Sequence, residues 1–384
     1  MIKHLRIGID VRLLTYRRGI GNYVYNLLQE LSKIDEQNEY ILYGNNKKAA
    51  RFIPDNPRFK FEVIGPALYP LWEQIVLPYH VKRDKIDVLH CPANAGPLWL
   101  TGKTKLVITI HDIMYMLPRS ILSSSPSLYQ NLGRKYLKWV VPTVAKRAAK
   151  VITISNYSKS DILKHIPINK NKIHVIYEAP GPNFRELNVL SKQDSIKRFG
   201  LSPLYILSFG ALDPRKNTAL VIEAFSKFRL KSKSSHQLVI VGLSEMQKQY
   251  FLKQITTLGI SSSVILLGFV SEEELVALYN GAYLLLYPSL YEGFGFPILE
   301  AMACGTPVIS SAVTSIPEIA GEAAILVNPT DIEAIAEAIH RLTKDKPFRE
   351  KLILMGYSRA SEFSWAKAAK ESLEVYTKIG NDLN

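Results

Sequence analysis

The chain has 384 residues, of which 47% are hydrophobic and 21% are charged, so a disordered or fibrous chain is excluded and two globular domains are expected. No run of about 18 apolar residues occurs, and we therefore expect no transmembrane helix. The net charge of +14 lies entirely in residues 1–180, where 27 Lys and Arg minus 13 Asp and Glu give +14, whereas residues 181–384 contain 21 of each.

Short β-rich runs alternate with amphipathic helical segments in the first half of the chain. The run at the amino terminus is typical of a first strand rather than of a signal peptide. The clearest helical segments cover residues 21–32 and 71–83. The runs predicted to form strands are residues 5–10, 39–44, 60–65, 86–91, 105–110, 150–155 and 172–177. Because these runs lack polar alternation and are separated by helices, they indicate a parallel sheet covered on both faces.

A basic segment, residues 133–150, lies in this first half. Its cationic residues are Arg134, Lys135, Lys138, Lys146, Arg147 and Lys150, and they flank an apolar centre that includes Trp139. Such a segment could lie on an anionic membrane surface or pack into the core, and Pro142 is predicted to interrupt its helix. An anionic acceptor would fit the same charge. Basic blocks of five or more residues do not occur in the sequence, so nucleic acid is not predicted as a partner.

The second half repeats the scheme. Its predicted strands are residues 204–210, 236–242, 263–268, 282–289, 306–311 and 323–328, and its clearest helices are residues 217–230 and 246–258. Ser271 and Ser364 can each cap a further helix. Residues 177–195, with two prolines and a glycine, interrupt both patterns and are predicted to contain the domain boundary. The predicted fold class is therefore α/β, with two doubly wound domains in succession.

The run SLYEGFGFPILEAMACGTPVIS, residues 289–310, contains the most specific pattern in the chain. A buried strand precedes it and PILEAMAC is helical, so LYEGFGF forms the turn between the carboxyl end of a strand and the start of a helix. Glu292 then stands at the edge of any ligand bound there. Glu300 lies about one turn into the helix, where its carboxylate can accept two hydrogen bonds from a ribose diol.

The glycines of this turn favour a phosphate at the helix start. Gly293 and Gly295 allow backbone conformations that other residues avoid, and they let a ligand approach closely. Free N–H groups of Gly295, Phe296 and Ile298 would suit a phosphate, helped by the helix dipole. Pro297 fits the first helical turn, where a missing N–H costs little.

A nicotinamide-binding fingerprint is the main alternative for Gly-x-Gly before a helix. The third glycine of that fingerprint would fall at Ile298, which has a large side chain. The motif also lies in the middle of the second half of the chain, and Glu292 precedes the loop where a dehydrogenase needs no acid. These observations exclude the dehydrogenase interpretation.

The run YEGFGFPILEAMACGTPVI resembles the Glu-x7-Glu motif of retaining nucleotide-sugar glycosyltransferases, in particular glycosyltransferase family 4, which has the GT-B fold. Further runs resemble family segments in the expected order over nearly the whole chain. These runs are IGIDVRLLTYRRGIGNYVYNLL, VITIHDIMYMLP, VITISNYSKSDIL and SFGALDPRKNTALVIEAF.

The resemblance implies two facing Rossmann-like domains with a cleft between them. The N-terminal, acceptor-side domain would cover residues 1–183, and a last helix, about residues 364–384, would pack back onto it. The C-terminal domain, residues 184–363, would bind the nucleotide-sugar. Open α/β sheets bind ligands at the carboxyl ends of their strands, which agrees with a shared cleft.

The resemblance also implies roles for individual residues. Arg215 and Lys216 would stabilise the leaving nucleoside diphosphate. Some family members have an arginine directly after the glycine of this strand, whereas Ala211 follows Gly210 here. Glu292 would bind the hydroxyls of the donor sugar. The implied donor-binding residues are Gly19, Ile20, Gly21, Gly210, Gly295, Phe296, Pro297, Ile298, Leu299 and Glu300.

His111 would face the transferred sugar, with Asp112 beside it, and it completes the implied catalytic set with Glu292, Arg215 and Lys216. A His-Asp pair at a strand end could instead be a satisfied turn, and that alternative stays open. Ser155 could cap the helix that follows its strand or contact a ligand, and the capping role is preferred.

No metal ion or other cofactor is predicted, because the sequence contains no Asp-x-Asp and no His/Cys cluster with ligand spacing. The resemblance implies a UDP- or GDP-linked sugar as the co-substrate. The runs PRKN, GIGNY and LWEQIVLP are similar to segments of mannosyltransferases. Relatives that use other hexoses share these segments, so the sugar is not determined. Cys91 and Cys304 lie in different halves of the chain and are interpreted as packing residues rather than as a disulfide. A protein without disulfides is typical of the cytoplasm, which is the predicted location. Contact with the inner face of the plasma membrane is a further prediction.

The sequence therefore predicts a retaining hexosyltransferase that acts on a hydroxyl of a glycan or of a polyprenyl-diphosphate-linked acceptor, in bacterial exopolysaccharide, O-antigen or envelope polysaccharide synthesis. Two alternatives remain open. One is a membrane-surface or polyanion-binding module with a decayed transferase site. The other is a GT-B UDP-sugar epimerase, whose acid/base carboxylates are not recognisable here.

Overall fold

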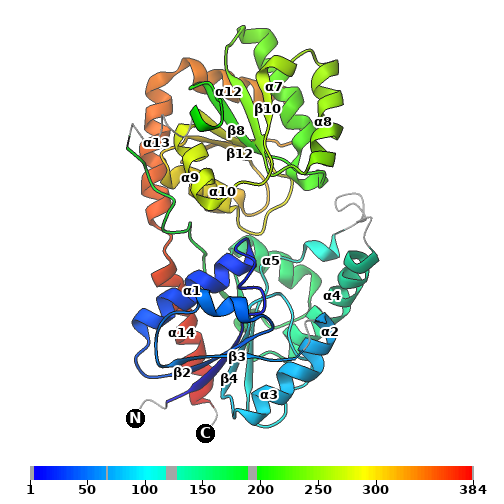
Figure 1. Cartoon of the computed structure of the whole chain (residues 1–384), viewed down its shortest axis with the longest axis vertical. Coiled ribbons are helices and arrows are strands. Elements are labelled where there is room, and N and C mark those ends of the chain that lie inside the picture. Colours follow the sequence, from blue (N-terminus) through cyan, green and yellow to red (C-terminus); the bar gives the residue numbers. More distant parts are fainter. Residues whose placement is uncertain (1–3, 66–67, 118–127, 189–196, 383–384) are drawn as a thin grey trace. The chain divides into compact units, whose positions relative to one another are not determined.

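A computed structural model describes residues 4–65, 68–117, 128–188 and 197–382. The chain forms two compact units, each with its own sheet and core (Figure 1). The N-terminal unit consists of the described residues within Met1–Leu117, Ser124–Glu178 and Ser364–Asn384. The C-terminal unit consists of those within Ala179–Phe363.

The N-terminal unit contains a seven-stranded parallel sheet. Its strands are β1 (Arg6–Asp10), β2 (Glu39–Gly44), β3 (Phe59–Val63), β4 (Val88–Cys91), β5 (Lys105–Thr109), β6 (Lys150–Thr153) and β7 (Ile173–Val175). All seven predicted strands are confirmed. The spatial order β3-β2-β1-β4-β5-β6-β7 reverses between β1 and β4, and ligands of such sheets bind outside the carboxyl ends at this point.

Helices cover this sheet and connect its strands. They are α1 (Ile20–Ile34), α2 (Tyr69–Leu71), α3 (Leu77–Arg83), α4 (Leu128–Arg147), α5 (Asn156–His165) and α14 (Trp365–Asn381), with 3-10 turns η1 (Lys47–Phe52), η3 (Met114–Met116) and η4 (Lys170–Lys172). A π-helical turn, η2 (Trp72–Val76), joins α2 to α3. Helix α14 packs beside α1, and Ser364 caps it as predicted (Figure 1).

Helix α4 corrects one prediction, because it continues through Pro142. Proline removes a backbone N–H and crowds the preceding turn, which is why an interruption was expected. The flanking apolar residues Val140, Val141, Val144 and Ala145 are all fully buried. Their burial against the core holds the helix together across the missing hydrogen bond.

The C-terminal unit contains a six-stranded parallel sheet of order β10-β9-β8-β11-β12-β13. Its strands are β8 (Tyr205–Phe209), β9 (Gln237–Val241), β10 (Val264–Leu266), β11 (Leu284–Tyr287), β12 (Val308–Ser311) and β13 (Ala324–Val327). The six predicted strands are confirmed, and so is the α/β fold class with two parallel sheets. The order of this sheet reverses between β8 and β11.

The helices of the C-terminal unit follow the strands in sequence. They are α7 (Thr218–Ser232), α8 (Glu245–Thr257), α9 (Glu272–Gly281), α10 (Phe296–Ala303), α11 (Ile316–Ala320), α12 (Ile332–Lys344) and α13 (Lys346–Ser361), with 3-10 turns η5 (Pro214–Lys216) and η6 (Ser261–Ser263). Ser271 caps α9 in a capping box with Glu274, as predicted. Within the described residues, no helix has the length and apolarity that crossing a membrane requires.

Candidate active site

The two motif loops of the C-terminal unit meet at the carboxyl edge of its sheet. Turn η5 follows β8 and the Glu292 loop follows β11, and these two strands are neighbours. The backbone N–H of Leu290 and the hydroxyl of Ser289 both donate to the carbonyl of Arg215, at 2.8 and 2.9 Å. The topology therefore brings together the acid and the basic pair that lie far apart in the sequence.

Glu292 and Lys216 form a partly buried ion pair in which the two side chains are 15% and 28% exposed. The Lys216 ammonium donates to Glu292 Oε1 at 2.7 Å and to the Tyr287 hydroxyl at 2.6 Å. Tyr287 and Ser289 also donate to Oε1. Burial alone would raise the pKa of Glu292, but Lys216 and these hydrogen bonds hold it below its ordinary value, so the carboxylate stays ionised.

Arg215 is oriented within its own turn. Its guanidinium donates to the carboxylate of Asp213, and Asp213 also accepts a hydrogen bond from the backbone N–H of Arg215 at 3.0 Å. The Arg215 side chain is 12% exposed. A guanidinium held in this way keeps its position before any anionic ligand arrives.

The start of α10 has the glycine conformation that was expected, but one of the expected free N–H groups is occupied. Gly295 is the N-cap with φ of 107°, a left-handed conformation that suits glycine. The N–H of Ile298 is not free as predicted, because it closes the first helical turn on the carbonyl of Gly295 at 3.0 Å. The side chains of Ile298 and Leu299 are fully buried, whereas Phe296 and Pro297 are partly exposed.

Glu300 lies in α10 and contacts a tyrosine of α9. Its Oε2 accepts a hydrogen bond from the hydroxyl of Tyr279 at 2.9 Å. Burial raises the pKa of Glu300 to about 7, although the Tyr279 hydroxyl acts in the opposite direction. Glu300 therefore changes its charge near neutral pH, unlike Glu292.

Gly210 is explained by packing. A Cβ added at this position would lie 2.5 Å from Cγ2 of Ile240 and 2.8 Å from Cδ2 of Leu243. The glycine therefore lets the chain leave β8 close to β9, where its N–H donates to the carbonyl of Val241 at 2.9 Å. Because Gly210 has no side chain, it could contact a ligand only through its backbone.

The glycine loop of the N-terminal unit follows β1. Gly19 is the N-cap of α1 with φ of 49°, and a Cβ there would meet no atom within 4 Å. A Cβ on Gly21 would lie 1.7 Å from the carbonyl oxygen of Tyr16, so the tight turn requires glycine. The N–H of Gly21 donates to the carbonyl of Arg18 at 3.1 Å, so it is not available to a ligand.

His111 lies just after β5, and both of its ring nitrogens have neighbours within the N-terminal unit. Nε2 lies 2.9 Å from the carbonyl oxygen of Pro92, and Nδ1 lies 3.1 Å from Oε1 of Glu178. Its carbonyl accepts a hydrogen bond from Ser158 at 3.0 Å. Asp112 accepts from the backbone N–H of Met114, as a turn residue does.

Ser155 accepts a hydrogen bond from the N–H of Ser158 and caps α5, which confirms the capping interpretation.

Three residues that contact the candidate site residues were not predicted from the sequence. They are Tyr287 and Ser289, which contact Glu292, and Glu178, which contacts His111. The only local signal for the first two was a polar residue at the end of a buried strand. Glu178 was hidden in the segment interpreted as a domain boundary.

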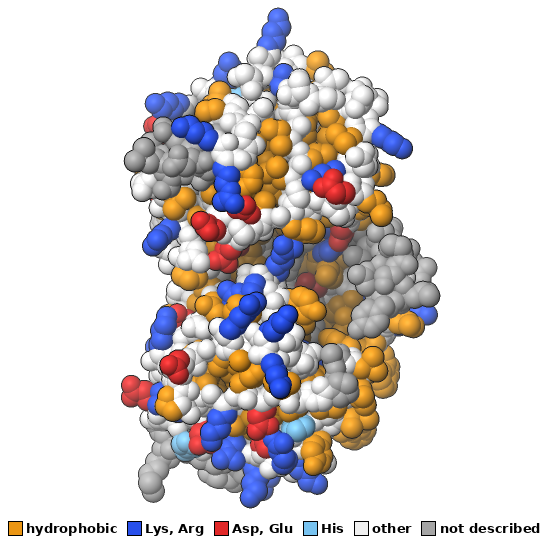
Figure 2. All heavy atoms as spheres, viewed as in Figure 1, with side chains coloured by type: hydrophobic (Ala, Val, Ile, Leu, Met, Phe, Trp, Pro, Cys, Tyr) orange, Lys and Arg blue, Asp and Glu red, His pale blue; other side chains and the backbone are white. Residues whose placement is uncertain are grey.

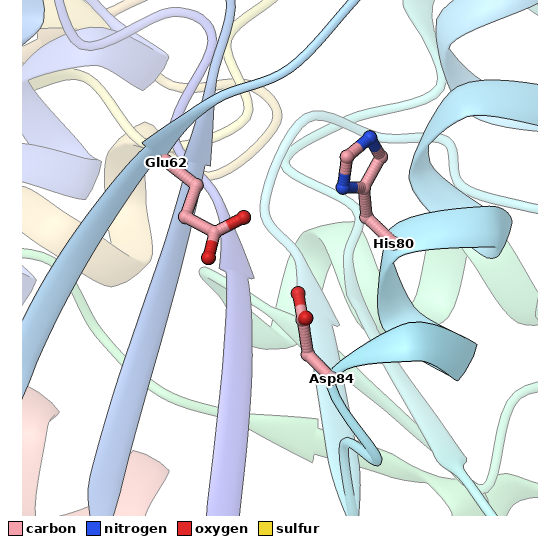
Figure 3. Close-up of side chains that lie close together, drawn as sticks. All are labelled: Glu62, His80 and Asp84. Carbon is pink, nitrogen blue, oxygen red and sulfur yellow. The ribbon is translucent and has the colours of Figure 1, made fainter.

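One cluster in the described residues has the composition of a metal site. Glu62 of β3, His80 of α3 and Asp84 at the end of α3 approach one another with ligand atoms within 4.8 Å (Figure 3). Arg83 forms ion pairs with both carboxylates, and the hydroxyl of Tyr43 donates to Asp84 at 2.8 Å. A guanidinium already neutralises these acids, so the cluster is explained without an ion.

Family comparisons cover most of the chain. The family described as "Glycosyl transferases group 1" matches residues 191–359, and "Glycosyltransferase Family 4" matches residues 17–179. The O-antigen chain mannosyltransferase B of Escherichia coli is 28% identical over 93% of this chain and 95% of that protein. An uncharacterized glycosyltransferase of Methanocaldococcus jannaschii, MJ1607, is 30% identical over 76% of this chain and 75% of that protein.

The chain spans only about a third of the length of another group of curated relatives. These are the serotype-specific mannosyltransferases WbdA of Escherichia coli, which are 28% identical over 72% of this chain and 34% of the protein. Solved structures show the same fold. Sucrose-phosphate synthase of Thermosynechococcus elongatus has a TM-score of 0.75 at 19% identity over 98% and 99% of the two chains. Anabaena Alr3699/HepE in complex with UDP and glucose has a TM-score of 0.74 at 18% identity over 97% and 99%.

Proposed function

Because this chain belongs to the retaining, metal-independent glycosyltransferases of family 4, which have the GT-B fold, we propose that it transfers a hexose from a nucleoside-diphosphate sugar to a hydroxyl group of an acceptor. The observation that carries this proposal is the ion pair of Lys216 with Glu292 at the carboxyl edge of the C-terminal sheet. In this proposal the C-terminal unit binds the donor and the N-terminal unit the acceptor.

Lys216 serves the leaving group. An ammonium has three N–H donors, and those directed at Glu292 and Tyr287 leave one for an oxygen of the diphosphate. Arg215 and the start of α10 would add positive potential around the same group. Charge that develops on the diphosphate as the sugar departs would therefore be stabilised without a metal ion.

Glu292 orients the donor sugar rather than attacking it. Its Oε1 accepts the three hydrogen bonds from Lys216, Tyr287 and Ser289, whereas Oε2 has no partner among the described residues. Oε2 is thus available to hydroxyl groups of the donor. A carboxylate paired with an ammonium is a weak nucleophile, so departure and attack on the same face of the sugar fit this site better than a covalent intermediate.

The nucleoside would lie along α10, with its ribose hydroxyls on Glu300. We take UDP- and GDP-linked glucose and mannose as the donor classes. The HepE structure is a complex with UDP and glucose, and the curated relatives of known specificity given above are named as mannosyltransferases. These names favour mannose as the first sugar to test.

The acceptor would be a glycan or a polyprenyl-diphosphate-linked glycan in bacterial polysaccharide synthesis, at the cytoplasmic face of the membrane. The positive charge of residues 1–180 supports an anionic acceptor. Exposed apolar side chains near the basic residues of α4 support contact with lipid, and Figure 2 shows hydrophobic side chains gathered over the edge of the N-terminal unit that carries α2 to α4. These exposed residues are Ile75, Tyr79, Trp99, Leu132 and Trp139.

Neither alternative from the sequence gains support. A decayed transferase would not need the paired Lys216 and Glu292. The acid/base carboxylates expected of an epimerase are not recognisable in the sequence. Both alternatives therefore rank below transfer.

Thermal unfolding with UDP, GDP, ADP or no nucleotide tests the donor site. A ligand present at about 100 times its dissociation constant adds about 2.7 kcal/mol to the free energy of unfolding. We expect one of UDP or GDP to raise the unfolding temperature and ADP to have little effect. An unchanged unfolding temperature with every nucleotide would contradict an intact donor site.

A further inference from the structure

Two buried histidines lie at the carboxyl ends of neighbouring strands in the N-terminal unit, and their surroundings differ. His90 lies near the end of β4, where Nε2 contacts the hydroxyl of Thr109 and Nδ1 contacts the hydroxyl of Tyr376, both at 2.7 Å. Hydroxyl groups can donate or accept, so they satisfy a neutral imidazole. Burial lowers the pKa of His90 to about 3, which agrees with a neutral ring.

The partners of His111 can only accept. The carbonyl oxygen of Pro92 lies 2.9 Å from Nε2, so this nitrogen must carry a proton. An ionised Glu178 also accepts only, and its Oε1 lies 3.1 Å from Nδ1. With both neighbours as acceptors, the ring satisfies them fully only as an imidazolium with a proton on each nitrogen.

Burial makes this pairing costly to break. Glu178 is 1% exposed and His111 is 7% exposed. A carboxylate buried to this degree needs an opposite charge, since an unpaired buried charge is strongly unfavourable. Apart from the contact at Nδ1, the two oxygens of Glu178 have no hydrogen-bond partner in the described part of the chain, so His111 is the cation that balances it.

The remaining groups around His111 complete its electrostatic surroundings. Asp112 adjoins it and favours the charged ring, whereas Tyr23 of α1 packs its ring edge-on at 4.9 Å between centroids and carries no charge at neutral pH. His90 is neutral. Although burial alone would lower the pKa of His111, Glu178 raises it above its ordinary value.

We infer that Glu178 is a positioning residue that holds His111 as an imidazolium, with its ring fixed at the carboxyl edge of β5. This inference rests on the proposed function and deepens it. Nε2 of His111 donates to Pro92 and Nδ1 lies 3.1 Å from the Glu178 carboxylate, so the ring acts as a fixed cation and neither takes nor gives a proton during transfer.

Nitrogen NMR of the full chain labelled with ¹⁵N-histidine tests the inference without any need for substrate. The His111 signals are identified by their loss in His111→Asn. We expect both ring nitrogens of His111 to be protonated at neutral pH, above the ordinary pKa of a histidine, while His90 shows a single neutral tautomer at the same pH. A neutral His111 ring at pH 7 in the wild-type protein would overturn the inference.

The variant Glu178→Gln removes the charge and keeps the size of the side chain. We expect His111 to lose its Nδ1 proton at pH 8 in this variant, and Glu178→Asp to retain it at least in part. If Glu178→Gln does not fold, the wild-type signals and Glu178→Asp still decide the matter. A His111 ring that stays doubly protonated in Glu178→Gln would show that Glu178 does not hold it.

Donor turnover provides the functional readout. We expect Glu178→Gln to lower kcat at pH 8 at least tenfold relative to the wild type, with recovery toward pH 5.5 as His111 regains its proton. A loss of equal size at every pH would indicate a purely structural role. If the wild type turns over no nucleotide-sugar, the proposed function fails, whereas the NMR result still decides the state of His111.

Discussion

At the scale of single residues, the proposed donor site consists of groups that hold one another in place. Glu292 keeps Lys216 directed into the loop, and Tyr287 contacts both of them. None of these contacts needs a ligand. A site assembled in this way spends little binding energy on ordering its side chains when the nucleotide-sugar arrives.

Glu300 should give nucleotide binding a pH dependence. Its pKa is raised to about 7, and only the ionised carboxylate can accept hydrogen bonds from both ribose hydroxyls. We expect the nucleotide Kd to fall about tenfold between pH 6 and pH 8, because the ionised fraction rises by about that factor. Isothermal titration calorimetry with wild type and Glu300→Gln checks this, and a wild-type Kd that stays constant would contradict the role of Glu300.

Glu300 should also make folding stability depend on pH, but in the opposite direction: nucleotide binding strengthens as the pH rises, whereas stability falls. The folded-state pKa of Glu300 lies above its ordinary value of 4.5, so its contribution to stability is fully present below about pH 4.5 and is lost as the pH rises through about 7. Urea unfolding of the unliganded protein at pH 5 and pH 8 measures the effect. We expect the wild type to lose more stability over this interval than Glu300→Gln, and equal losses would argue against the shifted pKa.

At the scale of elements, hydrophobic runs were sufficient to predict all thirteen strands, because buried parallel strands leave a continuous apolar signal. Breaks within helices were less predictable. The segment predicted as one helix over residues 71–83 contains the π-helical turn η2, and α4 continues through Pro142. In both cases packing against the sheet decides the outcome, and a local residue preference does not contain that information.

Helix α14 is tied to the core of the N-terminal unit through Tyr376. Its hydroxyl is the partner of Nδ1 of the buried His90, so Tyr376→Phe leaves that nitrogen unsatisfied. We expect a loss of about 1–3 kcal/mol in the free energy of unfolding. The exposed Tyr250 of α8 provides the matched control, since Tyr250→Phe should change stability by less than about 0.5 kcal/mol. Urea unfolding followed by circular dichroism compares the two, and equal stabilities would refute the buried contact.

At the scale of the whole molecule, the half of the chain that holds the net positive charge also carries two exposed tryptophans. Trp99 and Trp139 are 69% and 65% exposed, and the guanidinium of Arg147 lies over the ring of Trp99. A tryptophan beside a cation suits the interface of an anionic bilayer. This arrangement was visible in the sequence only as a basic segment around Trp139, because Trp99 comes from a different loop.

Vesicle binding tests this surface. We expect sedimentation with vesicles that contain anionic phosphatidylglycerol and little with phosphatidylcholine alone, and we expect added salt to weaken it. The double variant Trp99→Ala, Trp139→Ala should bind at least fivefold more weakly. Tyr250→Ala removes an exposed aromatic side chain from the C-terminal unit and should bind like the wild type. Equal binding by all three proteins would contradict a lipid-facing role for the two tryptophans.

Some candidate site residues could be predicted from a short stretch of sequence, and others could not because their partners are distant in the chain. Glu292 and Glu300 share one loop and helix, so their positions, together with the preceding strand and the two glycines, predicted a ligand-binding turn. Lys216 required the resemblance, since 76 residues separate it from the carboxylate it contacts. Glu178 could not be predicted, because its importance arises from a contact with His111 across the sheet topology and its own sequence reads as a loop.

Nucleotide-sugar turnover by wild type and Lys216→Ala tests most directly whether Lys216 and Glu292 form the donor site of a hexosyltransferase. We expect release of nucleoside diphosphate from at least one of GDP-mannose, UDP-mannose, UDP-glucose or GDP-glucose by the wild type, and at least a tenfold lower kcat in Lys216→Ala with the fold intact. Lys227→Ala, at an exposed ion pair of α7, should match the wild type. Near-normal turnover by folded Lys216→Ala would contradict the assigned donor site.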